Sequence, residues 1–219
     1  MQTVKRPDGH LVLVLGASRA GKTQYVLWLV RASKRLLVWD VSGQYAARYG
    51  LKSLSTLPEL ARWVQAQRGA ARVAYVPRSL DEFNGFCRCA FAFGLTAPGT
   101  VVVEEVAAST NAGKARGQWG RLVNQSLKSG LNLLVTAQRV AEIDKSVFGN
   151  ASVITIFRQN TVPDAERLAS DLRLSLSDIP DADVEYLQRL KDRTITKWRL
   201  QFVRNKPTPQ KIKAFSRSF

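Results

Sequence analysis

The chain has 219 residues, and because 45% of them are hydrophobic it can bury a full core, which argues against an intrinsically disordered chain. Its 33 Lys and Arg outnumber 17 Asp and Glu, and the formal charge of +16 points to a polyanionic partner, nucleic acid first and an anionic membrane surface second. The single His and the two Cys cannot complete a four-ligand metal site, so we expect Cys87 and Cys89 to be reduced, buried or half-buried thiols.

Apolar strands and amphipathic helices alternate along the chain. The N-terminal segment is polar, without the apolar core of a signal peptide, and nowhere do roughly 18 apolar residues follow one another as a transmembrane helix requires. Nearly all-apolar strands are expected at residues 11–15, 36–40, 72–76, 100–104, 132–136 and 153–157. Helices are expected at 22–33, 57–68, 80–93, 114–128 and 163–172. This order predicts an α/β fold, a mostly parallel sheet with helices on both faces.

The pattern changes after residue 175, so we predict a core of residues 1–175 and a C-terminal part of residues 176–219 that packs on or beside it. Segment 175–193 opens with Ser, Asp and Pro and carries Val184, Leu187 and Leu190 at helical spacing, which predicts a helix. The alternation of "TITKWRLQFV" predicts a strand, and a basic tail with two prolines follows it.

The segment between the first strand and the first helix fits the pattern G-x-x-x-x-G-K-[ST], known as Walker A. It reads Gly16, Ala17, Ser18, Arg19, Ala20, Gly21, Lys22 and Thr23. Glycines let the backbone turn its N–H groups toward phosphate oxygens, and the positive end of the helix dipole adds to the attraction. Lys22 is suited to the β- and γ-phosphates and the Thr23 hydroxyl to Mg²⁺. The sequence therefore predicts an ATP- and Mg²⁺-binding P-loop; the alternative is a Gly-rich turn before an ordinary helix.

Two adjacent carboxylates, Glu104 and Glu105, end the strand "VVVEE". Carboxylates at the end of a buried strand call for a cation or a proton-transfer task. In the Walker B arrangement of an ATPase, Glu104 would contact Mg²⁺ through water and Glu105 would polarise the attacking water. Glu105 favours hydrolysis over a nucleotide kinase or a GTP switch; the alternative is a solvated strand end.

Polar residues end two more strands, Asp40 after the second and Gln138 after the strand "NLLVTA". Ligands of open parallel sheets sit beyond the carboxyl ends of the strands, so these side chains are expected to gather with the P-loop. Asp40 is predicted to lie at the nucleotide. Gln138 is predicted to donate to the γ-phosphate or to hold the attacking water.

The stretch from Val106 to Ala141 has no acidic residue but several basic ones, and its first part, "ASTNAGKARGQWGR", is small, Gly-rich and polar. That composition suits a mobile loop at the pore or subunit edge of a ring, or a solvated basic face. An arginine acting on the γ-phosphate of a neighbouring subunit is predicted among Arg139, Arg121 and Arg158, and the sequence does not choose between them.

The motifs "GASRAGKT", "VWDVSGQY", "VVVEEV" and "LLVTAQRVAEIDKSVFGNASVITIFR" together resemble those of the FtsK–HerA superfamily of P-loop ATPases, over residues 11–190. The small size resembles the genome-packaging ATPases of tailless icosahedral viruses with an internal membrane. The resemblance implies a RecA-like (ASCE) domain whose sensor strand lies between the P-loop strand and the Glu104 strand, with Gln138 as the family's strand-end glutamine. Glu104 replaces the usual Asp, and Lys128-Ser129 stands where many relatives have an arginine, which leaves the trans-acting arginine open.

The resemblance further implies a ring, usually hexameric, that pumps double-stranded DNA into a preformed capsid at the packaging vertex of the virion, in the host cytoplasm. Contacts to DNA are then expected to its backbone, without sequence specificity. The alternatives are another motor of the same superfamily, for filamentous-phage assembly or DNA transfer, and a basic nucleic-acid-binding P-loop protein without motor activity. Stimulation of ATP turnover by DNA would distinguish the motors from a nucleic-acid-binding protein without motor activity.

Eight Lys and Arg and no acid follow Asp192, interleaved with Trp198, Phe202, Phe215 and Phe219. This tail suits contact with the DNA backbone, docking to a capsid-vertex or internal-membrane protein, packing on the adjacent subunit, or a solvated terminal segment. Pro207 and Pro209 argue against a long amphipathic helix.

Overall fold

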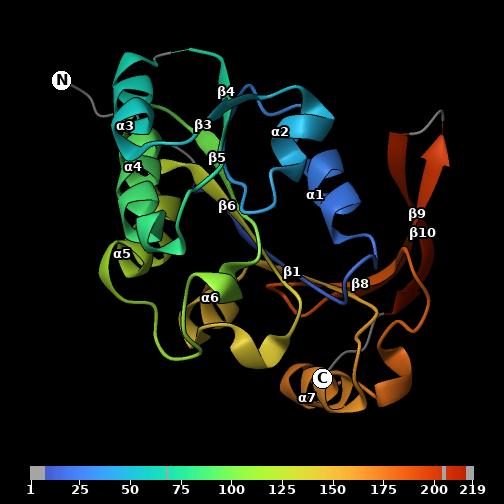
Figure 1. Ribbon diagram of the computed structural model, residues 1–219. Coiled ribbons are helices and arrows are strands. Elements are labelled where there is room, and N and C mark those ends of the chain that lie inside the picture. The colour runs from blue at the N-terminus through green and yellow to red at the C-terminus, as the bar shows by residue number, and fades with distance from the viewer. Residues whose placement is uncertain (1–7, 68, 204–205, 216–219) are drawn as a thin grey trace.

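The computed structural model describes residues 8–67, 69–203 and 206–215, which build a single ten-stranded sheet (Figure 1). The strand order is β10-β9-β8-β7-β1-β6-β5-β2-β4-β3. The strands are β1 Leu11–Leu15, β2 Arg35–Trp39, β3 Lys52–Leu54, β4 Ala71–Tyr75, β5 Gly99–Val103, β6 Leu131–Ala137, β7 Val153–Phe157, β8 Glu185–Leu190, β9 Ile195–Val203 and β10 Lys206–Phe215. The expected α/β fold is confirmed, and β6 lies between β1 and β5 as the resemblance implied.

Strands β1 to β7 pair in parallel, and both faces of this part of the sheet are covered. Alternate side chains of β1 show the two layers, because Leu13 and Leu15 belong to the core under α3, α4 and α5 whereas Val14 belongs to the core under α1. Strands buried on both faces need apolar residues at nearly every position, which explains their unbroken apolar runs.

Figure 1 shows α1 and α2 on one side of the sheet and α3, α4 and α5 on the other. The α-helices are α1 Lys22–Val30, α2 Gln44–Tyr49, α3 Leu57–Ala66, α4 Phe83–Thr96, α5 Gly117–Gln125, α6 Lys145–Asn150 and α7 Val162–Leu172. The short 3₁₀ helices are η1 Leu80–Glu82, η2 Val106–Ala108, η3 Ser126–Ser129, η4 Val140–Glu142 and η5 Leu176–Asp178. Thr56 and Thr161 cap α3 and α7, each followed by a proline in the first turn, as local sequence rules predict.

The helix predicted in segment 175–193 is wrong, because residues 185–190 form β8, antiparallel to β7. Tyr186 packs in the core under α1 and Leu187 in the core on the opposite face, so the strand is buried from both sides and its apolar residues imitate helical spacing. The predicted strand in "TITKWRLQFV" is confirmed as β9. Strands β8 to β10 continue the core sheet beyond β7.

The tail pairs with β9 as the edge strand β10, with Pro207 opposite Phe202 and Pro209 opposite Leu200. An edge strand accepts proline because one of its two sides has no partner that needs an N–H donor. Of the tail aromatics, Phe219 lies outside the described residues, and only the backbone of Phe215 is described.

Both cysteines lie in helix α4. Cys87 is buried in α4 and Cys89 is half-buried, and both are free thiols, as expected. Within the described ranges, no helix combines the length and the apolar character that a membrane crossing demands.

Candidate nucleotide-binding site

The P-loop leaves β1 at the carboxyl edge of the sheet and is tied to the ends of both neighbouring strands. The Gly16 N–H donates to the Ala137 carbonyl at 3.3 Å, and the Ala17 N–H donates to the Arg158 carbonyl at 2.7 Å. Gly16 has φ +152°, and a Cβ there would lie 2.6 Å from the Phe157 Cβ, so only glycine fits. The loop geometry thus follows directly from its position between β6 and β7.

Lys22 opens α1 and is buried, with 7% of its surface exposed. Its ammonium donates to the carbonyls of Gly16 at 2.7 Å and Ala17 at 2.9 Å, and it lies 3.9 Å from a carboxylate oxygen of Glu105. Burial lowers the pKa of Lys22, and the charges of Glu105 and Glu104 oppose that shift. The ammonium is therefore held at the mouth of the loop, where a phosphate would offer it a stronger acceptor.

The N-terminus of α1 has no side-chain cap and no acid in its first turn. Thr23, half-buried, lies in that turn beside Lys22. The free N–H groups and the helix dipole suit an anion, and a hydroxyl oxygen suits Mg²⁺. The P-loop residues thus fit the triphosphate of a nucleotide and its metal ion.

Glu104 directly follows β5 in a buried position and accepts hydrogen bonds from the hydroxyl of Ser42 at 2.9 Å and its N–H at 3.4 Å. Burial raises the pKa of Glu104 to about 7, with nearby Asp40 adding to the rise and the Ser42 bonds opposing it. A bound cation would favour the ionised form of Glu104, which fits a Mg²⁺ site there.

Asp40 is fully buried behind Glu104, where its Oδ2 accepts the Ala46 N–H at 2.9 Å. Its Oδ1 has no hydrogen-bond partner among the described residues. Asp40 is thus a neighbour of Glu104, and its place at the nucleotide stays a prediction.

Glu105 follows β5 in the left-handed region, with φ +46°, a conformation that costs a non-glycine residue on the order of 1 kcal/mol. Its N–H donates to the Thr136 hydroxyl at 3.0 Å, which holds the turn. Burial raises the pKa of Glu105, whereas the charge of Lys22 and a hydrogen bond from the Gln138 side chain lower it. The strained turn thus brings Glu105, Lys22 and Gln138 together.

The three candidate arginines lie in different settings. Arg139 is paired with Asp164 at 3.0 Å and with Glu142 at 3.4 Å, and Arg158 is paired with Asp183 at 2.8 Å. Arg121 lies on α5 with its guanidinium 4.1 Å from the centre of the Phe91 ring. Among the described residues, no guanidinium of the three bonds to the P-loop, although the main-chain carbonyl of Arg158 accepts the Ala17 N–H. Their trans-acting role stays a prediction.

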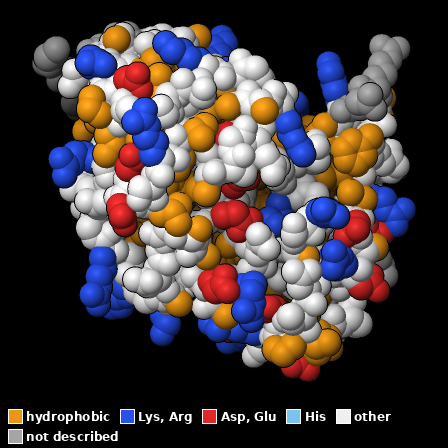
Figure 2. Space-filling model, in the orientation of Figure 1, with side chains coloured by type: hydrophobic (Ala, Val, Ile, Leu, Met, Phe, Trp, Pro, Cys, Tyr) orange, Lys and Arg blue, Asp and Glu red, His pale blue; other side chains and the backbone are white. Residues whose placement is uncertain are grey.

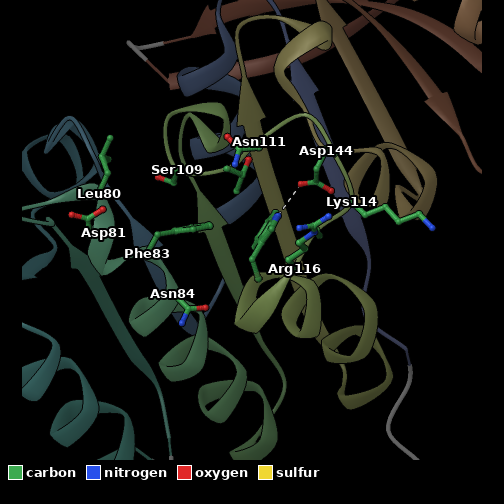
Figure 3. Close-up of a pocket in the computed structure, with 13 residues that line it drawn as sticks. Leu80, Asp81, Phe83, Asn84, Ser109, Asn111, Lys114, Arg116 and Asp144 are labelled. Carbon is green, nitrogen blue, oxygen red and sulfur yellow. Dashed lines mark hydrogen bonds between the residues drawn. The ribbon is translucent and has the colours of Figure 1, made fainter.

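A cleft of about 540 Å³ lies beside the site, between η1, the start of α4, α5 and the loop that follows Glu105 (Figure 3). The loop is anchored to α6, since the Gly113 carbonyl accepts the Lys145 N–H at 2.9 Å and the Ala115 N–H donates to the Ser146 hydroxyl at 3.0 Å. Trp119, which falls in the helix predicted at 114–128, is buried in α5 and donates to Asp144 at 2.8 Å. Figure 3 shows Lys114 extending away from the cleft.

Sequence reasoning assigned no role to Ser42, Tyr45 or Thr136. Ser42 and Thr136 hold the two catalytic candidates Glu104 and Glu105, and the Tyr45 hydroxyl is buried near them without a partner among the described residues. Thr136 could have been found only from the register of β5 on β6, which pairs Val103 with Val135.

This arrangement of sheet, loop and acids defines a P-loop NTPase of the RecA-like type, and solved structures of that type share the fold. The genome packaging NTPase B204 of Sulfolobus turreted icosahedral virus 2, in complex with AMPPCP, has a TM-score of 0.69 at 15% identity over 86% of this chain and 96% of that one. The cytoplasmic domain of the Type VII secretion ATPase EccC of Thermomonospora curvata has a TM-score of 0.56 at 12% identity over 86% of this chain and 25% of that one.

The chain belongs to the family of Protein P9 of Pseudoalteromonas phage PM2, to which it is 32% identical over 191 residues, covering 83% of this chain and 85% of that protein. It matches no protein-family model. The RecA-like P-loop fold that the resemblance implied is confirmed by these solved structures.

Proposed function

We propose that the chain is an ATP-hydrolysing translocase of double-stranded DNA that packages a viral genome into a preformed capsid. The observation that carries the proposal is the meeting of Lys22, Glu105 and Gln138 at the carboxyl edge of the sheet. The likeness to B204, described as a genome packaging NTPase, and the charge of +16 support it.

In this proposal the P-loop, Gly16 to Thr23, binds the triphosphate of ATP, and Lys22 exchanges the carbonyls of Gly16 and Ala17 for phosphate oxygens. Thr23 and, through water, Glu104 would hold Mg²⁺, which would neutralise charge on the phosphates. Glu104 must be ionised for that task, and the Ser42 hydroxyl favours its ionised form.

Glu105 then polarises the attacking water and Gln138 orients it. The half-buried position of Glu105 raises the pKa of its carboxyl and makes it a better base than a solvated carboxylate, while Lys22 and Gln138 keep it in place. The hydrogen bond to Thr136 fixes the backbone turn that aims it.

The loop after Glu105 would couple hydrolysis to DNA, since Lys114 and Arg116 are exposed in it and it begins directly after Glu105, the proposed general base. A ring of six copies would let Arg139, Arg121 or Arg158 reach the γ-phosphate of a neighbour. The ring would work at the packaging vertex, beside capsid-vertex or internal-membrane proteins, during assembly in the host cytoplasm.

The test is the rate of ATP hydrolysis with and without long duplex DNA, with particle size followed in the same sample. We expect stimulation by duplex DNA together with growth to ring-sized particles, and loss of turnover in Lys22→Ala. Turnover that is indifferent to DNA would refute a translocase while leaving an ATPase, and absence of turnover in the presence of Mg²⁺ would refute both.

A further inference from the structure

A second cleft, of about 500 Å³, lies between the exposed side of α1, the end of α2 and the start of β10. Figure 1 shows α1 facing the strand pair β9–β10, and Figure 2 shows the cleft as a notch between this pair and the body of the molecule, with Lys and Arg side chains near its edge. The side chains that give it chemical character are Trp28, Arg31, Arg48, Tyr49, Lys206 and Pro207.

Positive charge dominates this cleft, because Arg31, Arg48 and Lys206 line it and no acidic residue does. Arg72 lies near Tyr49, on whose hydroxyl its charge acts. Burial raises the pKa of the Tyr49 hydroxyl to about 12, and the charges of Arg48 and Arg72 oppose that rise. Within the described residues, no salt bridge neutralises any of these four cations, and the buried Arg72 Nε has no hydrogen-bond partner. Converging cations that lack a counter-charge favour an anionic ligand.

The Trp28 ring in this cleft is already engaged by neighbouring side chains. The Trp28 ring is covered by Tyr25 from the preceding turn, with ring centres 6.2 Å apart, and by the Arg31 guanidinium from the following turn, 4.2 Å from the ring centre. Pro207 has no N–H to donate to the main chain of a peptide. The site is therefore suited to point charges such as phosphates rather than to stacked bases or an extended peptide.

We propose that this cleft binds the phosphate backbone of duplex DNA, as a contact separate from the loop of Lys114 and Arg116 on the opposite face of the sheet. This inference rests on the proposed function, because it takes double-stranded DNA to be the partner of the chain. Both the α1 side of the cleft and the β9–β10 side are joined to the P-loop. Helix α1 begins at Lys22 of the P-loop. Strand β9 is linked to it through Val184, whose carbonyl accepts the Leu200 N–H at 2.9 Å and whose N–H donates to the Ala20 carbonyl at 3.0 Å. DNA held here would contact the helix that carries the phosphate-binding lysine.

The test compares two double variants that remove the same charge. Arg48→Ala with Lys206→Ala changes the cleft, and Arg62→Ala with Arg88→Ala removes two exposed cations from α3 and α4 on the other face. Binding of a duplex oligonucleotide is measured from about 50 to about 200 mM salt, where the logarithm of affinity falls in proportion to the number of phosphates neutralised. We expect the cleft variant to lower the slope by about 2 and the control to keep the wild-type slope. Lys206→Ala alone, on an exposed position of the edge strand, should lower it by about 1 and serves if Arg48→Ala unfolds α2.

Equal slopes for the two double variants would overturn the cleft as a DNA site while leaving the proposed function intact. Loss of binding to anionic phospholipid vesicles by the cleft variant, with its DNA slope unchanged, would overturn it in favour of a membrane contact. A wild-type chain that binds no duplex DNA would refute the DNA partner of the proposed function and this inference with it.

Discussion

Replacing Glu105 by Gln tests the chemistry most directly, because it removes a charge and a base while keeping the size of the side chain. Glu105 lies 3.9 Å from Lys22, and its charge is the largest influence that holds up the pKa of Lys22 against burial. At an effective dielectric constant of about 20 this attraction is at most about 4 kcal/mol, and the 29% exposure of the Glu105 side chain reduces it. The pKa of Lys22 should therefore fall further in the variant.

The expected result is a separation of binding from hydrolysis. A carboxylate beside the γ-phosphate repels it, so Glu105→Gln should bind ATP as tightly as the wild type or more tightly. Loss of a general base typically slows the chemical step by about 100- to 10,000-fold, or about 3 to 5 kcal/mol.

Fluorescent-nucleotide titration and phosphate release measure the two quantities at one pH. Glu166→Gln, on the exposed side of α7, is the matched control and should turn over like the wild type. Hydrolysis by Glu105→Gln within tenfold of the wild type would show that another group activates the water.

Two further predictions follow from the same geometry. Because burial raises the pKa of Glu104 to about 7 and its ionised form is the active one, kcat/KM should fall as the pH is lowered through about 7. Ser42→Ala removes a hydrogen bond to the carboxylate and should therefore move this fall in kcat/KM to higher pH. If the pH–rate profile of the variant does not move, the fall is not caused by Glu104. Gly16→Ala should lower the free energy of unfolding, measured by chemical denaturation, by about 1 to 3 kcal/mol, since the new Cβ would lie 2.6 Å from Phe157 at φ +152°. The control Gly113→Ala, whose Cβ would have no atom within 4 Å, should change it by less than about 1 kcal/mol. Equal effects of the two substitutions would contradict the close approach of the P-loop to β7.

The features that the sequence determined by itself are local ones. The P-loop is encoded by consecutive residues: glycines that free the backbone, a lysine that supplies charge and a threonine that supplies a hydroxyl group. The six predicted core strands were recognisable because strands covered on both faces must be apolar throughout. Thr56 and Thr161 likewise mark helix starts through bonds to their own near neighbours. Local physics of this kind needs no partner from elsewhere in the chain.

Tertiary structure decided whatever depends on which strands become neighbours. Val184, Leu187 and Leu190 have helical spacing, yet pairing with β7 and burial from both sides make residues 185–190 a strand. The same holds for the polar partners, because Thr136 reaches Glu105 only through the pairing of β5 with β6, and Ser42 and Asp40 reach Glu104 only through the pairing of β2 with β5. The cleft of Arg31, Arg48 and Lys206 joins residues up to 175 positions apart, so its charge becomes visible only once α1, α2 and β10 have packed together.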